Sequence, residues 1–153
     1  MYPASRPRPD AVGVVVLRGG GEAARVLLLH RARGAFAGAW TIVMGGVEAG
    51  ERATDTARRE VLEEAGLRVT ALYTAGELDS FYDPVKDRIV SVPFFVARVE
   101  DGDVRTDGAH DDSRWATFAE ADEALTFAAQ RRLLVEVQRA FIEREPEAWR
   151  AIP

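Results

Sequence analysis

The sequence predicts a single domain of the α/β (α+β) class, which contains both strands and helices. Two runs of β-branched and aliphatic residues, 12–17 and 26–29, flank three consecutive glycines and indicate a β-hairpin. Small apolar residues recur at every fourth position from residue 53 to residue 65, which predicts a helix that packs on a sheet. A second apolar stripe, in residues 127–144, predicts a longer helix. The length of 153 residues is that of one domain.

The first half of the chain contains the segments that lead to the first helix. Residues 1–9 include three prolines and two arginines, which indicates an extended arm, so the domain is expected to span residues 10–153. Residues 32–39 are small and contain glycine, which is typical of a loop. Residues 40–44 predict a short strand that ends at a turn made by two adjacent glycines. The helix then follows over residues 52–65.

The second half predicts two further strands and two helices. Residues 68–78 and 89–99 have strand character, and Pro93 in the second indicates a sheet edge or a bulge. Residues 79–88 contain Phe81 and Tyr82 and are expected to form an exposed aromatic loop. The remaining predicted elements are a polar loop over 106–113, a short strand over 114–118, a brief helix over 119–125 and the longer helix over 127–144.

Charge and composition exclude several classes of protein. The net charge of −5 argues against binding nucleic acid through a basic surface. The absence of cysteine excludes a disulfide, a thiolate nucleophile and a zinc–thiolate site. No run approaches the roughly 18 apolar residues of a membrane span, and the first residues lack the apolar core of a signal peptide. We therefore expect a soluble, cytoplasmic protein that binds neither nucleic acid nor a membrane.

Three acidic residues of the first predicted helix lie on one of its faces. Glu60, Glu63 and Glu64 occupy positions i, i+3 and i+4, which span an arc of about 100°. They repel one another, and they lie near the helix C-terminus, where the helix dipole disfavours each anion by roughly 0.3–1 kcal/mol. This repulsion indicates that a cation binds there. Mg²⁺ and Mn²⁺ are the best candidates, because both prefer carboxylate oxygens.

The ends of this helix carry their own sequence signals. Thr54 or Asp55 is suited to cap its start. Gly66 is suited to end it, because glycine adopts the left-handed backbone conformation without strain. Arg59 can reach back to Glu51 across the preceding loop, and this contact would hold the loop against the helix.

The segment from residue 45 to residue 67 resembles the Nudix box, the motif G-x5-E-x7-R-E-U-x-E-E-x-G-U, in which U is aliphatic. Every fixed position is matched, by Gly45, Glu51, Arg59, Glu60, Val61, Glu63, Glu64, Gly66 and Leu67. Such a match at fixed spacing rarely arises by chance. The resemblance implies the Nudix fold, an α/β/α sandwich with a mixed sheet, over about residues 12–141. One departure is Met44, which precedes the glycine pair where many relatives have proline.

The resemblance also implies an activity, a cofactor and a set of site residues. Nudix enzymes hydrolyse a diphosphate linkage in a nucleoside diphosphate joined to another group, with Mg²⁺ or alternatively Mn²⁺. The implied metal ligands are Glu60, Glu63, Glu64 and the carbonyl of Gly45 or Gly46. Arg59 and Glu51 would orient the helix rather than touch the metal. Either Glu60 or Glu63 would serve as the general base, and the sequence does not choose between them.

Aromatic and basic residues outside the box are candidates for binding the substrate. Phe81 and Tyr82 are expected to stack on a base, because a loop has little structural reason to carry adjacent aromatic residues. Trp40 is equally suited to stack on a base and to belong to the core. Arg31 is a further candidate for contact with the substrate.

The loop before residue 114 is a candidate for an auxiliary role. Many relatives have a glutamate there that assists as an extra ligand or base, and the place before His110 is Ala109 in this chain. Asp111 and Asp112 flank His110 and are the nearest substitutes, with Asp107 also nearby. His110 itself fits a hydrogen-bonding role in the loop better than a catalytic one.

These features predict a metal-dependent pyrophosphohydrolase that acts on a small nucleotide. The favoured reaction converts a (deoxy)nucleoside triphosphate to the monophosphate and pyrophosphate. The alternative within the same class is hydrolysis of ADP-ribose or another nucleoside-diphosphate sugar. The alternative from another class is a non-catalytic domain that binds a nucleotide as a sensor. The expected partner is the nucleotide alone, and the chain is expected to be a monomer or a homodimer.

Overall fold

The structure is a computed structural model that describes residues 7–153. Its strands within these residues are β1 (Ala11–Arg18), β2 (Arg25–Arg31), β3 (Trp40–Thr41), β4 (Val43–Gly46), β5 (Val69–Asp83), β6 (Arg88–Val99), β7 (His110–Ala116) and β8 (Ala151–Ile152). They form one sheet with the order β3-β2-β1-β6-β5-β8, in which β4 also pairs with β1 and β7 also pairs with β2. The sheet is mixed, because β1 and β6 are parallel whereas β1 and β2 are antiparallel.

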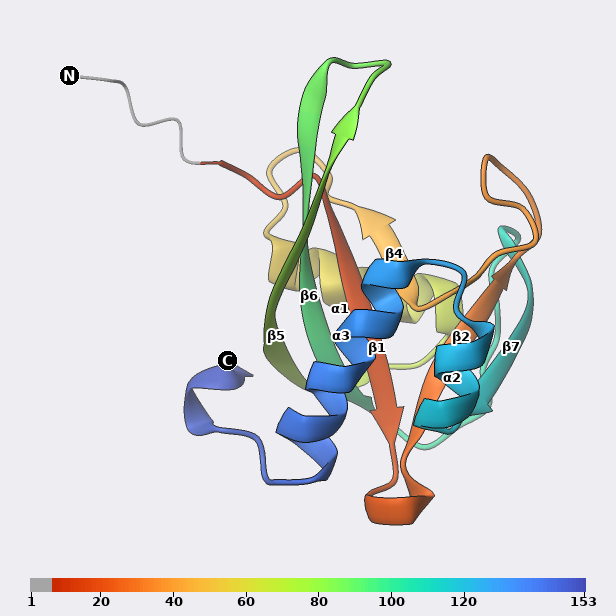
Figure 1. The fold of residues 1–153 in the computed structure, drawn as a ribbon, viewed down its shortest axis with the longest axis vertical. Helices are drawn as coiled ribbons and strands as arrows, with labels where there is room; N and C mark the ends of the chain where they lie inside the picture. Colours follow the sequence, from red (N-terminus) through yellow and green to blue (C-terminus); the bar gives the residue numbers. More distant parts are fainter. Residues whose placement is uncertain (1–6) are drawn as a thin grey trace.

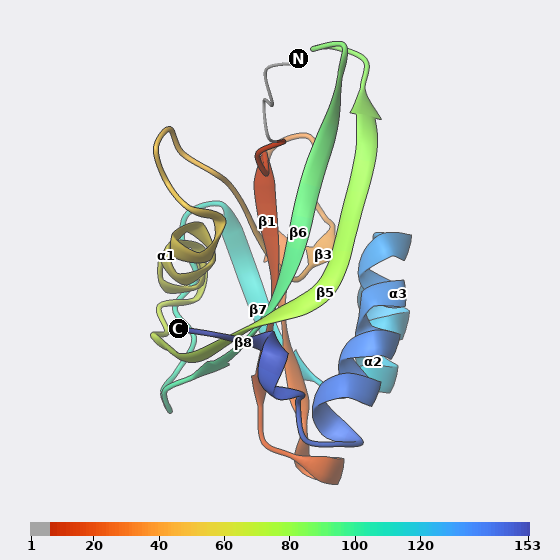
Figure 2. The same cartoon turned by 90° about the vertical axis from the view of Figure 1, so that its left-hand side faces the viewer.

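Helices cover both faces of this sheet. Helix α1 (Ala53–Ala65) lies on one face, and helices α2 (Phe118–Ala124) and α3 (Ala128–Val137) lie on the other (Figure 2). The predicted α/β/α sandwich is therefore confirmed. Six of the nine residues of the predicted N-terminal arm, residues 1–6, lie outside the described residues. No helix within the described residues is both long and apolar enough to span a membrane.

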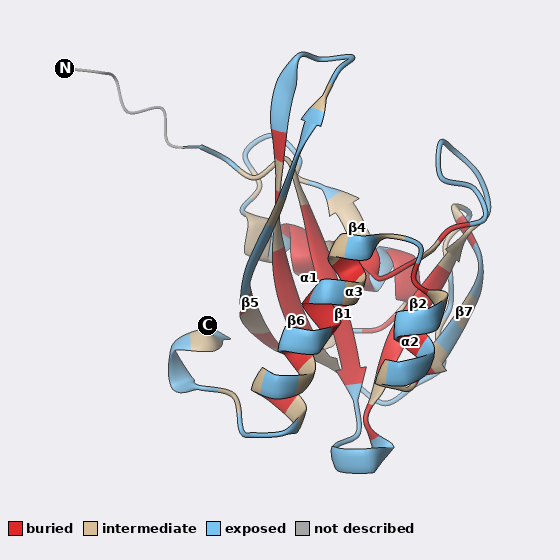
Figure 3. Cartoon of the chain, in the orientation of Figure 1, coloured by how far each residue is buried: buried red, intermediate tan, exposed pale blue. Residues whose placement is uncertain are grey.

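Strand β1 separates two apolar cores. Val14 and Val16 belong to the core under α1, whereas Val15 and Leu17 belong to the core under α2 and α3, because successive side chains of a strand point to opposite faces. The strand is buried on both faces (Figure 3), which explains why its sequence is a continuous apolar run. The predicted hairpin is also confirmed, since Leu17 pairs with Val26.

The segment before α1 differs from the prediction of one strand over residues 40–44. It forms two strands, β3 paired with β2 and β4 paired with β1, with Ile42 between them. The Ile42 N–H donates to the side-chain carbonyl of Gln130 on α3 at 3.1 Å instead of to another strand. The chain changes its pairing partner at this residue, and a pattern of apolar residues contains no signal for such a change.

The prediction of an exposed aromatic loop over residues 79–88 is correct for the exposure but wrong for the conformation of residues 79–83, which belong to a strand. Strands β5 and β6 continue as a two-stranded ribbon that projects beyond the body of the molecule (Figure 1), with Phe81 opposite Val90 and Tyr82 opposite Ile89. The aromatic pair therefore alternates across a ribbon, and its two side chains point to opposite faces. The signal at Pro93 was correct, because it lies opposite Leu78 beside a register irregularity of β5.

The last third of the chain also shows corrections. Strand β7 begins at His110, so His110, Asp111 and Asp112 belong to a strand paired with β2 rather than to a polar loop. Helix α3 ends at Val137 and continues as a wider π-helical turn (Gln138–Ile142). Strand β8, which pairs with β5 through Leu72 and Tyr73, had no sequence signal because it has only two residues.

Candidate active site

Helix α1 begins without the predicted cap. Arg52 is the residue before the first helical turn, and no side chain caps it, so the expectation of Thr54 or Asp55 is wrong. Glu51 organises this start instead, because its carboxylate accepts hydrogen bonds from the Glu48 N–H at 3.1 Å and the Thr56 hydroxyl at 2.8 Å. The far end follows the prediction, since Gly66 adopts the left-handed conformation with φ of 70°.

Arg59 joins the loop to the helix. Its Nε and Nη2 atoms donate to the two carboxylate oxygens of Glu51 at 2.8 and 2.9 Å, and Nη2 also donates to the Gly46 carbonyl at 3.0 Å. Its Nη1 donates to Glu60 at 2.7 Å and to Glu63 at 3.1 Å. These hydrogen bonds lower the pKa of Glu51 to about 2 and raise the pKa of Arg59. The contact between Arg59 and Glu51 is the one that the sequence indicated.

The glutamates of α1 differ in burial. Glu60 is buried, and its carboxyl group lies so close to Gly45 that a Cβ atom on residue 45 would be 2.0 Å from Glu60 Cδ. Burial raises the pKa of Glu60, although the hydrogen bond from Arg59 opposes that effect. Glu63 forms an ion pair with Arg59, and its side chain is exposed. A side chain at position 45 would therefore displace the Glu60 carboxylate.

Glu64 is the most strongly perturbed carboxylate of the site. It is 6% exposed, and its Oε2 atom accepts a hydrogen bond from the Met44 N–H at 3.2 Å. Burial, and then the charge of Glu60, raise its pKa to about 8. Buried carboxylates with too little positive charge around them fit a divalent cation, which would supply that charge. The donor set is one that Mg²⁺ or Mn²⁺ accepts.

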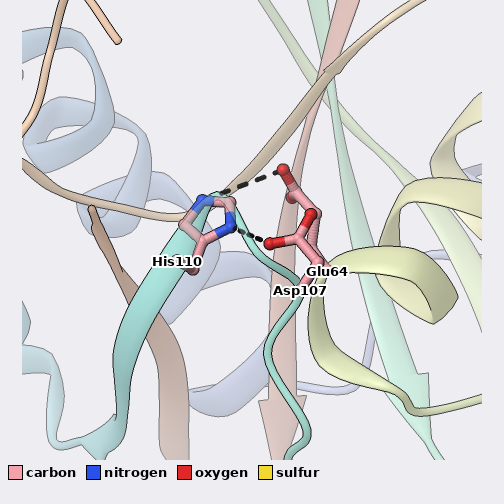
Figure 4. Close-up of side chains that lie close together, drawn as sticks. All are labelled: Glu64, Asp107 and His110. Carbon is pink, nitrogen blue, oxygen red and sulfur yellow. Dashed lines mark hydrogen bonds and ion pairs between the residues drawn. The ribbon is translucent and has the colours of Figure 1, made fainter. Parts of the chain in front are cut away.

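His110 and Asp107 extend the site from β7 and the segment before it (Figure 4). His110 Nδ1 and Asp107 Oδ1 are 2.7 Å apart, and His110 Nε2 lies 3.9 Å from Glu64 Oε1. Ligand atoms of these three residues lie within 4.8 Å of one another. Sequence reasoning placed His110 near the site but preferred other aspartates to Asp107. The spacing of three residues between Asp107 and His110 was the signal that could have identified the pair.

Asp111 and Asp112 lie elsewhere, which corrects the expectation that they stand nearest to the site. Asp111 forms an ion pair with His30, whose hydrogen bond lowers the pKa of Asp111. Asp112 is exposed, and its carboxylate accepts a hydrogen bond from the Ser113 N–H at 2.7 Å. Neither of them belongs to the group that surrounds Glu64.

A cavity of about 440 Å³ lies between the start of α3 and the strands. Its lining includes Arg31, Phe36, Met44, Phe81, Phe94, Phe127 and Gln130. Phe36 and Phe127 form an edge-to-face pair with ring centroids 5.1 Å apart. Gln130 accepts a hydrogen bond from the Ile42 N–H through its side-chain oxygen, which leaves its amide nitrogen as a donor. The lining thus combines aromatic side chains with polar ones.

Two of the four candidate substrate-binding residues line this cavity, and the other two do not. Phe81 and Arg31 line the cavity. Tyr82 and Trp40 are not among its lining residues: the Tyr82 hydroxyl donates to Asp87, and the Trp40 ring packs against His30 at 5.0 Å between centroids. Of the alternatives for Trp40, the structure favours a place in the core.

Comparison with curated proteins gives two informative relatives. The chain is 35% identical over 133 residues to an octanoyltransferase of Myxococcus xanthus, a match that covers 82% of this chain and 35% of that protein. It is 46% identical over 54 residues to the oxidized purine nucleoside triphosphate hydrolase of Mus musculus, a match that covers 35% of this chain and 35% of that protein. The chain thus matches about a third of the length of each.

Solved structures with the same fold include a Caenorhabditis elegans Ap4A hydrolase in a binary complex, with a TM-score of 0.70, 24% identity and coverage of 84% of this chain and 94% of that chain. They also include the NUDIX domain of Shewanella oneidensis NrtR complexed with ADP ribose, with a TM-score of 0.72, 15% identity and coverage of 91% and 92%. A family model described as the NUDIX domain matches residues 7–144. The chain therefore belongs to the NUDIX domain family.

Proposed function

We propose that this NUDIX pyrophosphohydrolase converts a nucleoside triphosphate, or its deoxy form, to the monophosphate and pyrophosphate. The observation that carries the proposal is the position of Met44. Its N–H binds Glu64, while the residue also lines the aromatic cavity, so the acidic site and the cavity are immediate neighbours. One molecule with a charged diphosphate and a flat apolar base fits both at once.

The residues of α1 would hold the metal that this chemistry needs. Glu60, Glu63 and Glu64 would be its ligands, because they share one face and two of them are buried beside Gly45 and Met44. When bound, Mg²⁺ or Mn²⁺ supplies positive charge that offsets the negative diphosphate and acidifies a water molecule. The hydrogen bonds from Arg59 to Glu51 and to the Gly46 carbonyl hold the loop against the helix. Alternatively, Glu63, whose carboxylate is exposed, would serve as the general base instead of as a third ligand.

The cavity would bind the nucleoside. Phe81 and Phe127 offer faces for a base, and stacking of this kind is worth about 1–3 kcal/mol per base. The amide nitrogen of Gln130 can donate a hydrogen bond to an acceptor atom on the base. Arg31 lines the cavity, and its positive charge partly opposes the rise in the pKa of Glu64, so it acts on both the cavity and the acidic site. That position suits contact with a phosphate.

The choice of a triphosphate over ADP-ribose rests on the relatives. The relative from Mus musculus is named a nucleoside triphosphate hydrolase and is 46% identical over the matched 54 residues. The NrtR domain was solved with ADP ribose, but its 15% identity carries an argument about the fold alone. A non-catalytic sensor is disfavoured, because burying the Glu64 carboxylate beside Glu60 is unfavourable without a further positive charge.

A panel of nucleotides tests the proposal directly. Nucleoside triphosphates, ADP-ribose and nucleoside-diphosphate sugars are incubated with the protein and Mg²⁺ or Mn²⁺, and the products are identified by phosphorus NMR. We expect a triphosphate to yield pyrophosphate with the highest kcat/KM. Formation of a monophosphate from ADP-ribose with a higher kcat/KM would select the alternative. A complete lack of hydrolysis with both metals would support the sensor.

Glutamine variants of the acidic residues test the assignment of the metal ligands. Glu63→Gln and Glu64→Gln should each lower kcat about 100-fold or more, because each loses a charge that holds the metal. Glu123→Gln, an exposed change on α2, is the control and should keep full activity. If both site variants keep near-native kcat, the carboxylates of α1 are not metal ligands.

A further inference from the structure

His110 is a buried histidine in which one ring nitrogen is hydrogen-bonded and the other is not (Figure 4). Its side chain is 2% exposed, and its Nδ1 atom lies 2.7 Å from Asp107 Oδ1. An ionised carboxylate only accepts hydrogen bonds, so in the neutral imidazole the proton is on Nδ1. The lone pair is then on Nε2. A carboxylate that fixes the tautomer of a histidine in this way is typical of histidines that bind metals.

The Nε2 atom points toward a carboxylate that it does not reach. The nearest acidic oxygen is Glu64 Oε1 at 3.9 Å, which is too far for a hydrogen bond. Within residues 7–153, Nε2 makes no hydrogen bond, and Glu64 is the acidic side chain that faces it. Glu64 cannot turn freely to close the gap, because its other oxygen accepts from the Met44 N–H.

The gap has the size of a metal site. Bonds of about 2.0–2.2 Å join a divalent transition metal to an imidazole nitrogen or a carboxylate oxygen, so two ligand atoms about 4 Å apart can share one ion. Asp107 Oδ1 is already bonded to the ring, which leaves Nε2 and Glu64 Oε1 as the facing pair. A ring nitrogen that is oriented by Asp107, lies on a buried side chain and faces Glu64 is an observation independent of the acidic residues themselves.

We propose that His110 is a nitrogen ligand of the metal centre, with Glu64 as its carboxylate partner and Asp107 as a positioning residue. Imidazole nitrogen suits first-row transition ions, whereas Mg²⁺ favours oxygen alone. The site therefore binds Mn²⁺ in preference to Mg²⁺ at this position. The inference rests on the proposed function for the role of the metal, but it concerns binding and is tested without turnover.

Electron spin-echo spectroscopy of bound Mn²⁺ gives the sharpest test, because it detects a nitrogen bonded to the ion. The protein contains only two histidines, so labelling histidine with ¹⁵N limits the signal to His30 and His110. We expect a ¹⁵N coupling in the unmodified protein, its loss in His110→Gln, and its retention in His30→Gln. His30 is the matched control, because it is paired with Asp111 and lies outside the Glu64 group.

Metal affinity gives a second readout. His110→Gln should weaken Mn²⁺ binding about 10–100-fold and change Mg²⁺ binding less than about 2-fold. Asp107→Ala should weaken Mn²⁺ binding about 10-fold, since the ring loses its orientation. Asp107→Asn should restore much of that loss, because an amide oxygen still accepts from Nδ1–H.

The two proposals fail in different ways. Absence of ¹⁵N coupling in the unmodified protein, or its persistence in His110→Gln, overturns the nitrogen ligand even if nucleotides are hydrolysed. If His110→Gln does not fold, His30→Gln decides the question, because His110 is then the one histidine left. A ¹⁵N coupling in that variant supports the nitrogen ligand, and its absence overturns it. A coupling to His110 in a protein that hydrolyses no nucleotide supports this inference and overturns the proposed function.

Discussion

Gly45 and Glu60, fifteen positions apart in the Nudix box, are in direct contact in the fold. The Glu60 carboxyl group occupies the space where a side chain at position 45 would lie, with Cδ only 2.0 Å from an ideal Cβ. The neighbouring Gly46 has no such constraint, since its nearest atom, the carbonyl oxygen of Asp10, is 4.0 Å away. The two adjacent glycines therefore have different reasons to be glycine.

Alanine at each position measures this difference. Gly45→Ala should lower stability by about 1–3 kcal/mol, the usual effect of overpacking, which shifts the melting temperature by several degrees in a chain of this size. Gly46→Ala is the matched control and should shift the melting temperature by less than about 1 °C, because its added methyl group meets open space. Thermal unfolding of the metal-free protein gives both values. Equal melting temperatures for the two variants would show that Glu60 leaves its place at no cost.

The sequence predicted that the residues of α1 lie together, as they do in the structure, but it misplaced those of β7. Glu60, Glu64 and Arg59 follow from helical spacing, and spacing is fixed by the helix itself. Asp111 is adjacent to His110 in sequence, yet adjacent residues of a strand point to opposite faces. A register irregularity between His30 and Arg31 shifts this pairing further. Proximity in sequence was therefore a poor guide to proximity in space.

Among the elements, the ribbon of β5 and β6 had the least reliable sequence signal. Adjacent aromatic residues with nearby Asp and Pro indicated a loop, but cross-strand pairing of Phe81 with Val90 extends the strands almost to the turn. The consequence is functional as well as structural. Within a strand only one of two adjacent side chains can face the cavity, and that residue is Phe81.

Alanine variants of the aromatic pair test this assignment. Phe81→Ala should raise KM for a nucleoside triphosphate about 10-fold, because a lost stacking contact is worth about 1–3 kcal/mol. Tyr82→Ala should leave KM within about 2-fold, a difference below about 0.4 kcal/mol. The comparison is well matched, since the two side chains are 53% and 56% exposed. Steady-state kinetics decides it, and a larger effect at Tyr82 would mean that the base lies on the other face of the ribbon.

At the scale of the whole molecule, the two faces of the sheet carry different parts of the candidate site. Helix α1 on one face brings the charged residues, and α3 on the other closes the cavity. Strand β4 connects them through Met44. The sequence predicted both layers, because amphipathic helices and apolar strands have clear periods. It did not predict that the cavity and the acids would meet at β4, because that depends on the change of pairing at Ile42.

The raised pKa of Glu64 predicts how the stability of the folded protein depends on pH. Glu64 has an ordinary pKa of 4.5 and a folded-state pKa of about 8, so the folded protein keeps a proton that the unfolded chain releases between these values. Its contribution to stability is fully present below pH 4.5 and is lost as pH rises to about 8. The metal-free protein should lose up to about 1.4 kcal/mol per pH unit in this window. Melting curves in buffers from pH 5 to pH 8 measure the effect, and Glu64→Gln should flatten it.

Divalent metal should reverse this trend, because the ion binds the ionised carboxylates of the folded site and not the unfolded chain. At pH 8 with millimolar Mn²⁺ or Mg²⁺, the melting temperature should rise above that of the metal-free protein. The rise should shrink toward pH 5, where protons compete for Glu64. Glu63→Gln should narrow it at pH 8, whereas Glu123→Gln should not. A melting temperature that is indifferent to both metals at pH 8 would mean that no metal site is formed by the fold.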